Sequence, residues 1–234
     1  MSGAIWFITG TDTGVGKTRV TAGLLAAARE AGLNGAGMKP VAAGVQWREG
    51  QAVSADALEI AAASGQSTPY DDLNPFCLIE PISPHIAADR ANIRIDIDEI
   101  VEIAHRLAQA HELLLIEGAG GWYTPLGPEG SMADLARELA APVVLVVGLR
   151  LGCLNHARLT REAIEQSGCR FGGWIASHVD PYFDAVEENL ATLENLLGAP
   201  PLGALPFERE RTRDALHLRD ALPHLHPARA GQIT

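Results

Sequence analysis

The sequence contains few cysteines, no long apolar run and little positive charge. Its three cysteines, Cys77, Cys153 and Cys169, are odd in number and far apart, which argues against a disulfide framework and favours a reducing compartment. No stretch reaches eighteen apolar residues, so we expect no transmembrane helix and no membrane partner. The N-terminus lacks the basic start and the small-residue cleavage site of a signal peptide. Together these absences predict a cytoplasmic protein.

Positive charge is scarce throughout the chain. The formal net charge is −11, which argues against general binding to nucleic acid or to anionic membranes. Only two of the 18 lysine and arginine residues are lysines, Lys17 and Lys39. A lysine carries a compact point charge that arginine does not supply, so both positions are candidates for contact with a phosphate group.

The order of the apolar segments predicts a single α/β domain over residues 1–234. Apolar runs alternate with helical patterns, which indicates a mainly parallel sheet with helices on both faces. Strands are expected at 4–10, 35–39, 112–117, 142–148, 171–178 and 202–205. Helices are expected at 17–31, 55–64, 97–110, 132–140, 155–167 and 184–197. A proline-rich excursion over the sheet edge is expected at 66–95, and an irregular tail from about 223 to 234.

Residues 5–18 carry the strongest local signal. A short apolar strand leads into a glycine-rich turn, and Lys17 and Thr18 then begin a helix. This is the layout of a phosphate-binding loop, in which backbone N–H groups and the helix dipole face an anion, the lysine reaches the terminal phosphates and the threonine hydroxyl binds Mg²⁺. Gly10 and Gly16 are separated by five residues instead of the usual four, but strand, turn and helix follow in order. We therefore predict a P-loop NTPase-type fold.

Three further polar residues are expected near this loop. Glu117 ends an apolar strand, where many phosphate-loop enzymes place the acid that holds Mg²⁺ or its water. Asp56 stands near a helix start after Ser54, either as a metal ligand or as an acid that complements the helix dipole. Lys39 ends another strand, either as surface charge or, in a chain with two lysines, at the bound phosphates. Ligands gather at the carboxyl ends of parallel strands, so these residues are expected to meet.

Taken together, these segments resemble the dethiobiotin synthetase family. The matching segments lie in family order and are Thr9–Thr18, Met38–Gly44 with Asp56, Glu80–Ala87, Glu117–Trp122, Leu151–Ala157 and Gly173–Ala176. The resemblance implies an ATP- and Mg²⁺-dependent ligase of biotin synthesis. One amine of 7,8-diaminononanoate takes up CO₂ as a carbamate, and the carbamate oxygen attacks the γ-phosphate of ATP. The second amine then closes the ring and yields dethiobiotin, ADP and phosphate.

The resemblance also implies residue roles. The residues implied in catalysis are Lys39, Lys17 and Thr13. The implied metal ligands are Thr18, Asp56 and Glu117. The residues implied at ATP are Gly14, Val15, Gly16, Lys17, Thr18, Arg19, Asp56, Glu117, Gly118, Ala119, Gly120, Ser177, His178, Pro206, Phe207 and Glu208. Those implied at the diamine are Thr13, Lys39, Ala43, Gly152, Cys153, Leu154 and Asn155. Family members are homodimers, and the helix start at 152–155 would serve the partner's site.

Several positions depart from the family pattern, and two alternatives stay open. The family often has Ser at the position of Ala43, and some members have Glu at the position of Gly14. An Asn-Asp pair often stands where this chain has Ser177 and His178. One alternative is a partition-type switch ATPase, although those proteins carry a second lysine where this chain has Asp12. The other is an amide-forming ATPase domain of cobalamin synthesis, which usually comes attached to a glutamine-hydrolysing domain.

Overall fold

One parallel sheet organises the protein. The computed structural model describes residues 3–65, 67–128, 130–208 and 213–226. The six strands of the sheet are all parallel and lie in the order β12-β11-β10-β1-β7-β2. Their bounds are β1 Ala4–Gly10, β2 Gly35–Met38, β7 Leu113–Glu117, β10 Val143–Leu149, β11 Phe171–His178 and β12 Ala204–Leu205. All six were predicted as strands, and the last is shorter than the predicted 202–205.

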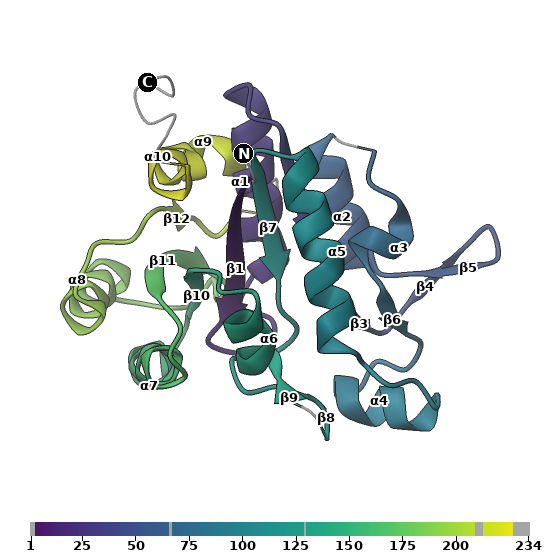
Figure 1. Ribbon diagram of the computed structural model, residues 1–234. Helices are drawn as coiled ribbons and strands as arrows, with labels where there is room; N and C mark the ends of the chain where they lie inside the picture. Colours follow the sequence, from purple (N-terminus) through teal and green to yellow (C-terminus); the bar gives the residue numbers. More distant parts are fainter. Residues whose placement is uncertain (1–2, 66, 129, 209–212, 227–234) are drawn as a thin grey trace.

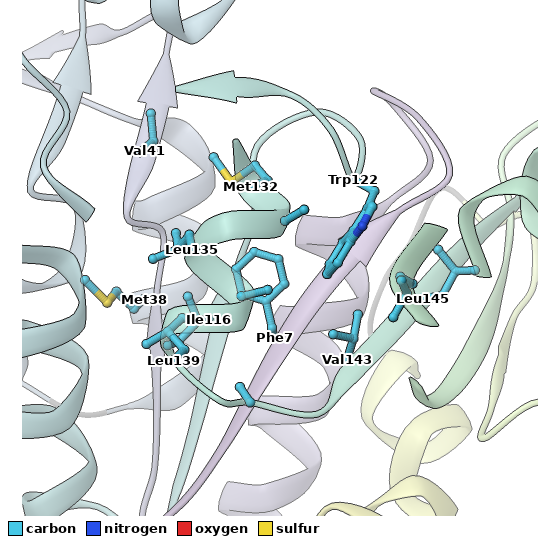
Figure 2. Close-up of a cluster of buried hydrophobic side chains, with 14 of the residues drawn as sticks. Phe7, Met38, Val41, Ile116, Trp122, Met132, Leu135, Leu139, Val143 and Leu145 are labelled. Carbon is cyan, nitrogen blue, oxygen red and sulfur yellow. The ribbon is translucent and has the colours of Figure 1, made fainter. Parts of the chain in front are cut away.

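Helices cover both faces of the sheet, as predicted (Figure 1). The long helices are α1 Lys17–Glu30, α2 Ala55–Ser64, α5 Ile97–Ala110, α6 Met132–Glu138, α7 Cys153–Gln166 and α8 Val186–Leu197. On one face Trp6 and Ile8 of β1 pack with α1 and α2. On the other face Phe7 packs with α5 and α6, and Figure 2 shows it among Ile116, Trp122 and Leu135. Successive residues of a strand point to opposite faces, so β1 contributes to both clusters.

Short elements fill the region beside the edge strand β2. The segments β3 Val41–Ala43 and β6 Phe76–Leu78 pair in parallel, and α3 Tyr70–Leu73 and α4 Pro84–Arg90 flank β6 in the chain. Two small antiparallel pairs are formed by β4 Gln46–Arg48 with β5 Gln51–Val53 and by β8 Pro125–Gly127 with β9 Gly130–Ser131. The excursion predicted at 66–95 therefore contains defined secondary structure.

The end of the chain differs from the predicted irregular tail. Residues 214–225 form α9 Asp214–Leu218, a 3₁₀ turn at Arg219–Ala221 and α10 Leu222–Leu225. The prediction is wrong for 223–225 because Leu222 and Leu225 are buried on the α1 face of the sheet, and the indole N–H of Trp6 donates to the carbonyl of Leu225 at 2.8 Å. The rest of the predicted tail, 227–234, lies outside the described residues. No described helix has both the length and the apolar character to cross a membrane.

Two glycines on β2 provide a matched test of how closely the helices pack on the sheet. A methyl group on Gly37 would overlap Cγ2 of Ile60 and lie 2.8 Å from Leu25, whereas on Gly35 it would lie 3.5 Å from Leu25. We predict that Gly37→Ala lowers the free energy of unfolding by about 1–3 kcal/mol, because the core is overpacked. Gly35→Ala should leave it nearly unchanged. Urea denaturation measures both, and equal losses would contradict the packing described here.

Candidate functional site

The loop between β1 and α1 has the geometry of an anion-binding turn. Gly14 and Gly16 adopt positive φ angles of 72° and 89°, which glycine reaches without steric penalty. Gly16 precedes α1, and no side chain caps the helix. The N–H groups of the first helical turn lack intrahelical partners and carry the positive end of the helix dipole, so they suit phosphate oxygens. Val15 is buried and anchors the loop against Gly148 of β10.

Lys17 lies across the mouth of this loop. Its ammonium donates to the carbonyl oxygens of Asp12, at 2.9 Å, and Gly120, at 2.6 Å. Burial, together with the nearby charge of Lys39, lowers the pKa of Lys17 to about 8. Among the described residues only these two neutral carbonyls accept its hydrogen bonds. A polyanion bound in the loop would therefore compensate the charge of the ammonium better than they do.

Lys39 forms an ion-pair network with two carboxylates. Its Nζ lies 2.5 Å from Oε1 of Glu117 and 2.9 Å from Oδ2 of Asp56. Burial by itself lowers the pKa of Lys39, but the charges of Glu117 and Asp56 outweigh it and the pKa is raised. Burial likewise opposes ionisation of Asp56, and Lys39 more than compensates, so the pKa of Asp56 is lowered. Lys39 and Asp56 therefore hold each other in their charged forms.

The oxygen atoms at this network fit a hard divalent cation. Oε2 of Glu117 is fully buried and has no hydrogen-bond partner among the described residues. Thr18 Oγ1 donates to Oε1 of the same carboxylate at 2.9 Å, and the carboxylate of Asp56 is about half exposed. The described residues contain no cluster of three or more His, Cys, Asp and Glu side chains suited to a metal. Two carboxylates and one hydroxyl match Mg²⁺, which takes few protein ligands and completes its shell with water and phosphate.

A cavity of about 810 Å³ joins these groups. It brings together most of the residues implied at the phosphates, the metal and the diamine: Thr13, Gly14, Gly16, Lys17, Thr18, Lys39, Ala43, Asp56, Glu117, Ala119 and Gly120. Most of them come from the carboxyl ends of β1, β2 and β7, as expected for a parallel sheet. Asp56 comes from the start of α2, and Ala43 ends β3. Residues 81–83, which precede α4, and Pro84 at its first position form another wall.

Arg19 also lines this cavity, but its side chain is held by the far end of the chain. Its guanidinium makes two hydrogen bonds to the carboxylate of Asp214, at 2.6 and 2.8 Å, and a third to the carbonyl of Pro206 at 2.8 Å. Arg19 and Asp214 are both buried. Arg19 thus fastens the chain after β12 to the phosphate loop and does not extend its charge toward the phosphates. The partner is 195 positions away, and no local signal identified it.

The expected base-binding residues surround the outer edge of the loop. Ser177 is buried directly beneath Gly16: a Cβ placed there would lie 2.5 Å from the Ser177 hydroxyl oxygen, which has no partner among the described residues. His178 bonds the carbonyl of Asp180 at 2.9 Å, and its ring meets that of Phe207 edge-on at 6.0 Å. Ser177 therefore lies against the loop backbone, while His178 and the partly exposed Phe207 offer ring surfaces. Glu208 is exposed.

The start of α7 lies apart from this cavity and departs from one expectation. The segment 152–155 was predicted to present free N–H groups to the substrate, but the N–H of Cys153 already donates to the carbonyl of Arg150 at 3.0 Å, and its side chain is buried. The donors of Leu154 and Asn155, in the first helical turn, still suit an anion. Arg150 pairs with Asp12 at 2.6 Å, which links this segment to the phosphate loop.

Comparison with known proteins identifies the family. A family model described as an AAA domain matches residues 5–215. The ATP-dependent dethiobiotin synthetase BioD of Aromatoleum aromaticum is 47% identical over 201 residues, covering 86% of this chain and 89% of that protein. The enzyme of the same name from Pseudomonas aeruginosa is 46% identical over 212 residues, covering 90% of this chain and 93% of that protein. The chain belongs to the dethiobiotin synthetase family. The resemblance carried by its sequence motifs is thereby confirmed.

Solved structures confirm the predicted fold. The cell division protein MinD of Aquifex aeolicus superposes with a TM-score of 0.57 at 15% identity, over 97% of this chain and 96% of that one. A ParA family ATPase of Chlorobium tepidum superposes with a TM-score of 0.55 at 13% identity, over 97% of this chain and 94% of that one. At these identities the likeness concerns the fold alone, so the partition-type alternative gains no support against relatives of the dethiobiotin synthetase family at 41–47% identity.

The buried pair of Lys39 and Glu117 leads to a stability prediction. Lys39→Ala should lower the free energy of unfolding by about 3–5 kcal/mol, because it leaves the Glu117 carboxylate buried and uncompensated. Adding Glu117→Gln should recover part of that loss, and a double-mutant cycle by urea denaturation measures the coupling. Arg158→Ala, which breaks the exposed pair with Glu162, is the control and should change stability far less. Additive effects at Lys39 and Glu117 would refute the predicted coupling.

Proposed function

We propose that this protein catalyses the ATP- and Mg²⁺-dependent closure of the ureido ring in biotin synthesis. The substrates are 7,8-diaminononanoate, CO₂ and ATP, and the products are dethiobiotin, ADP and phosphate. The main support for the proposal is that Lys17, Lys39 and Glu117 meet at the phosphate loop in one cavity, where Oε2 of Glu117 has no partner within the described part of the chain. The names of the relatives support the same reaction.

The proposed Mg²⁺ ligands are Thr18, Asp56 and Glu117. When bound, the ion would neutralise part of the charge on the phosphates. In the present arrangement the Lys39 ammonium lies between the two carboxylates that this cation would use. A cation at those oxygens would replace the charge that Lys39 now supplies, so the flexible lysine side chain could turn toward the reacting groups.

Lys17 and Lys39 are the proposed catalytic cations. The carbamate and the transferring phosphoryl group both carry negative charge, and two buried ammonium groups stabilise charge that spreads during transfer. Thr13, exposed at the cavity mouth, would hydrogen-bond the diamine or the carbamate. No enzyme nucleophile is needed, because holding the two amines, the carbamate and the γ-phosphate together supplies much of the rate.

The nucleotide would lie along the loop, with its phosphates at 14–18 and 118–120. The base would lie near Ser177, His178 and 206–208. Because Ser177 is buried under the loop and His178 bonds Asp180, stacking on His178 and Phe207 is the contact that these side chains support best. We place the reaction in the cytoplasm, with no nucleic-acid or membrane partner, and assign the whole chain to one ligase domain.

The substrate site is proposed to be shared across a homodimer. Large apolar side chains are exposed on α7 and beside it: Leu151 at 90%, Tyr123 at 58% and Leu159 at 56%. Exposed apolar residues gathered on one element mark an association surface. A partner docked there would bring the start of its own α7, at 152–155, to the diamine carboxylate, by the arrangement implied for the family.

The proposed reaction is tested by following a labelled carbon. The protein is incubated with the diamine, ¹³C-bicarbonate, ATP and Mg²⁺, and mass spectrometry should detect dethiobiotin with one labelled carbon, together with one ADP and one phosphate per product. Omitting either the diamine or bicarbonate should abolish steady ATP turnover. Lys17→Ala should lower turnover at least ~10²-fold. A switch ATPase would hydrolyse ATP without either substrate, and that result would refute the proposal.

The dimer proposal gives a separate prediction. Sedimentation at micromolar concentration should show about twice the 24.8 kDa mass of the chain. Leu151→Glu should yield a monomer that binds ATP but turns over the diamine slowly, because a charge cannot be buried at an apolar interface. Leu216→Glu, at a leucine that is 65% exposed on α9 across the sheet, should stay dimeric and active. A fully active Leu151→Glu monomer would rule out the shared site.

A further inference from the structure

Lys39 is held by its backbone as well as by its ammonium group. Its N–H donates to the carbonyl of Leu73 at 2.8 Å, and its carbonyl accepts from Nδ2 of Asn74 at 2.6 Å. Asn74 is buried and its other amide atom, Oδ1, accepts from the hydroxyl of Tyr70 at 3.1 Å. Both polar atoms of the Asn74 amide are therefore engaged, which fixes its orientation.

The same tyrosine hydroxyl reaches the helix that carries Asp56. The backbone N–H of Ser54 donates to Tyr70 Oη at 2.6 Å. Ser54 is buried and caps α2, since its side chain accepts from the N–H of Ala57 at 3.3 Å. Asp56 lies in the first turn of α2, so the position of Ser54 sets where its carboxylate points.

These contacts close into a ring. From the Lys39 carbonyl the connection passes through Asn74, Tyr70 and Ser54 to the start of α2, and the carboxylate of Asp56 then returns to the Lys39 ammonium at 2.9 Å. The hydroxyl of Tyr70 accepts from Ser54 and donates to Asn74, so it joins the Lys39 side of this ring to the α2 side. Burial raises the pKa of this phenol to about 12, so the hydroxyl keeps its proton to donate.

We propose that Tyr70 and Asn74 are positioning residues that hold the backbone of Lys39 and the carboxylate of Asp56 in register for the proposed reaction. This inference rests on the proposed function and adds two residues to it that touch neither substrate nor phosphate. The lysine side chain must be free to move between the carboxylates and the reacting groups. A backbone clamped at both its N–H and its carbonyl confines that movement to the side chain, which preserves the geometry at the site.

The test is Tyr70→Phe, which keeps the ring and removes the hydroxyl. We expect about a tenfold lower kcat and about a tenfold higher Mg²⁺ concentration for half-maximal rate, the size typical of residues that orient metal ligands. The KM for the diamine should stay within twofold. Tyr182→Phe, at an exposed tyrosine before α8, is the matched control and should have the parent's kcat, Mg²⁺ dependence and KM for the diamine. A Tyr70→Phe protein that is folded and has the parent's kcat and Mg²⁺ dependence overturns the inference.

A second variant separates positioning from simple loss of stability. The side chain of Asn74→Ser is too short to reach both Lys39 and Tyr70, so this variant should show the same change in kcat and Mg²⁺ dependence. The double variant with Tyr70→Phe should also lose only about tenfold in kcat, because both residues act in the same series of hydrogen bonds. A hundredfold, additive loss overturns the inference, as does a change in melting temperature alone. Titration calorimetry of a non-hydrolysable ATP analogue with Mg²⁺ provides an independent measurement. Weaker Mg²⁺-dependent binding by either variant supports the inference. A parent protein that makes no dethiobiotin would refute the proposed function but not this inference.

Discussion

The rest of the site depends on one buried ion pair, between Lys39 and Glu117. Glu117 has no exposed surface, and an isolated carboxylate in such a position is strongly unfavourable. The ammonium of Lys39, 2.5 Å away, and the hydroxyl of Thr18 compensate it. The end of β2, the end of β7 and the start of α1 must therefore meet at one point. The same carboxylate retains one buried oxygen without a partner among the described residues, and this is an oxygen at which we propose that Mg²⁺ binds.

The sheet order makes this meeting possible. β1 lies between β10 and β7, and β7 pairs on its other side with β2, all in parallel. The phosphate loop, Glu117 and Lys39 consequently leave the same edge of the sheet from three adjacent strands. Outside this centre a set of polar contacts fixes the backbone: Arg19 with Asp214 on the side of β12, and Tyr70 with Asn74 beside β2. The groups that line the cavity thus lie on a backbone that these contacts fix.

The main strands and long helices could be predicted because their patterns are local. Parallel strands buried on both faces are continuous apolar runs, and long helices repeat their apolar positions over several turns. The strands β3 and β6 were missed because each has three residues and exists only through pairing with a segment distant in the chain. The helical end at 214–225 was missed for a related reason: its leucines are ordered by packing on α1, and a four-residue helix has too few turns to show a period.

By itself the sequence determined the chemistry that is available: a strand, a glycine turn and Lys17-Thr18 in direct succession predict a phosphate loop. It also indicated that Lys39 and Glu117 end strands and that Asp56 stands near the start of a helix. Only the tertiary structure decided the pairings, which place Lys39 between two carboxylates, turn Arg19 to Asp214 and bring Ser177 beneath Gly16. The physical reason is that these pairs are remote in the chain, and their contact depends on strand order and helix packing, which local periodicity does not encode.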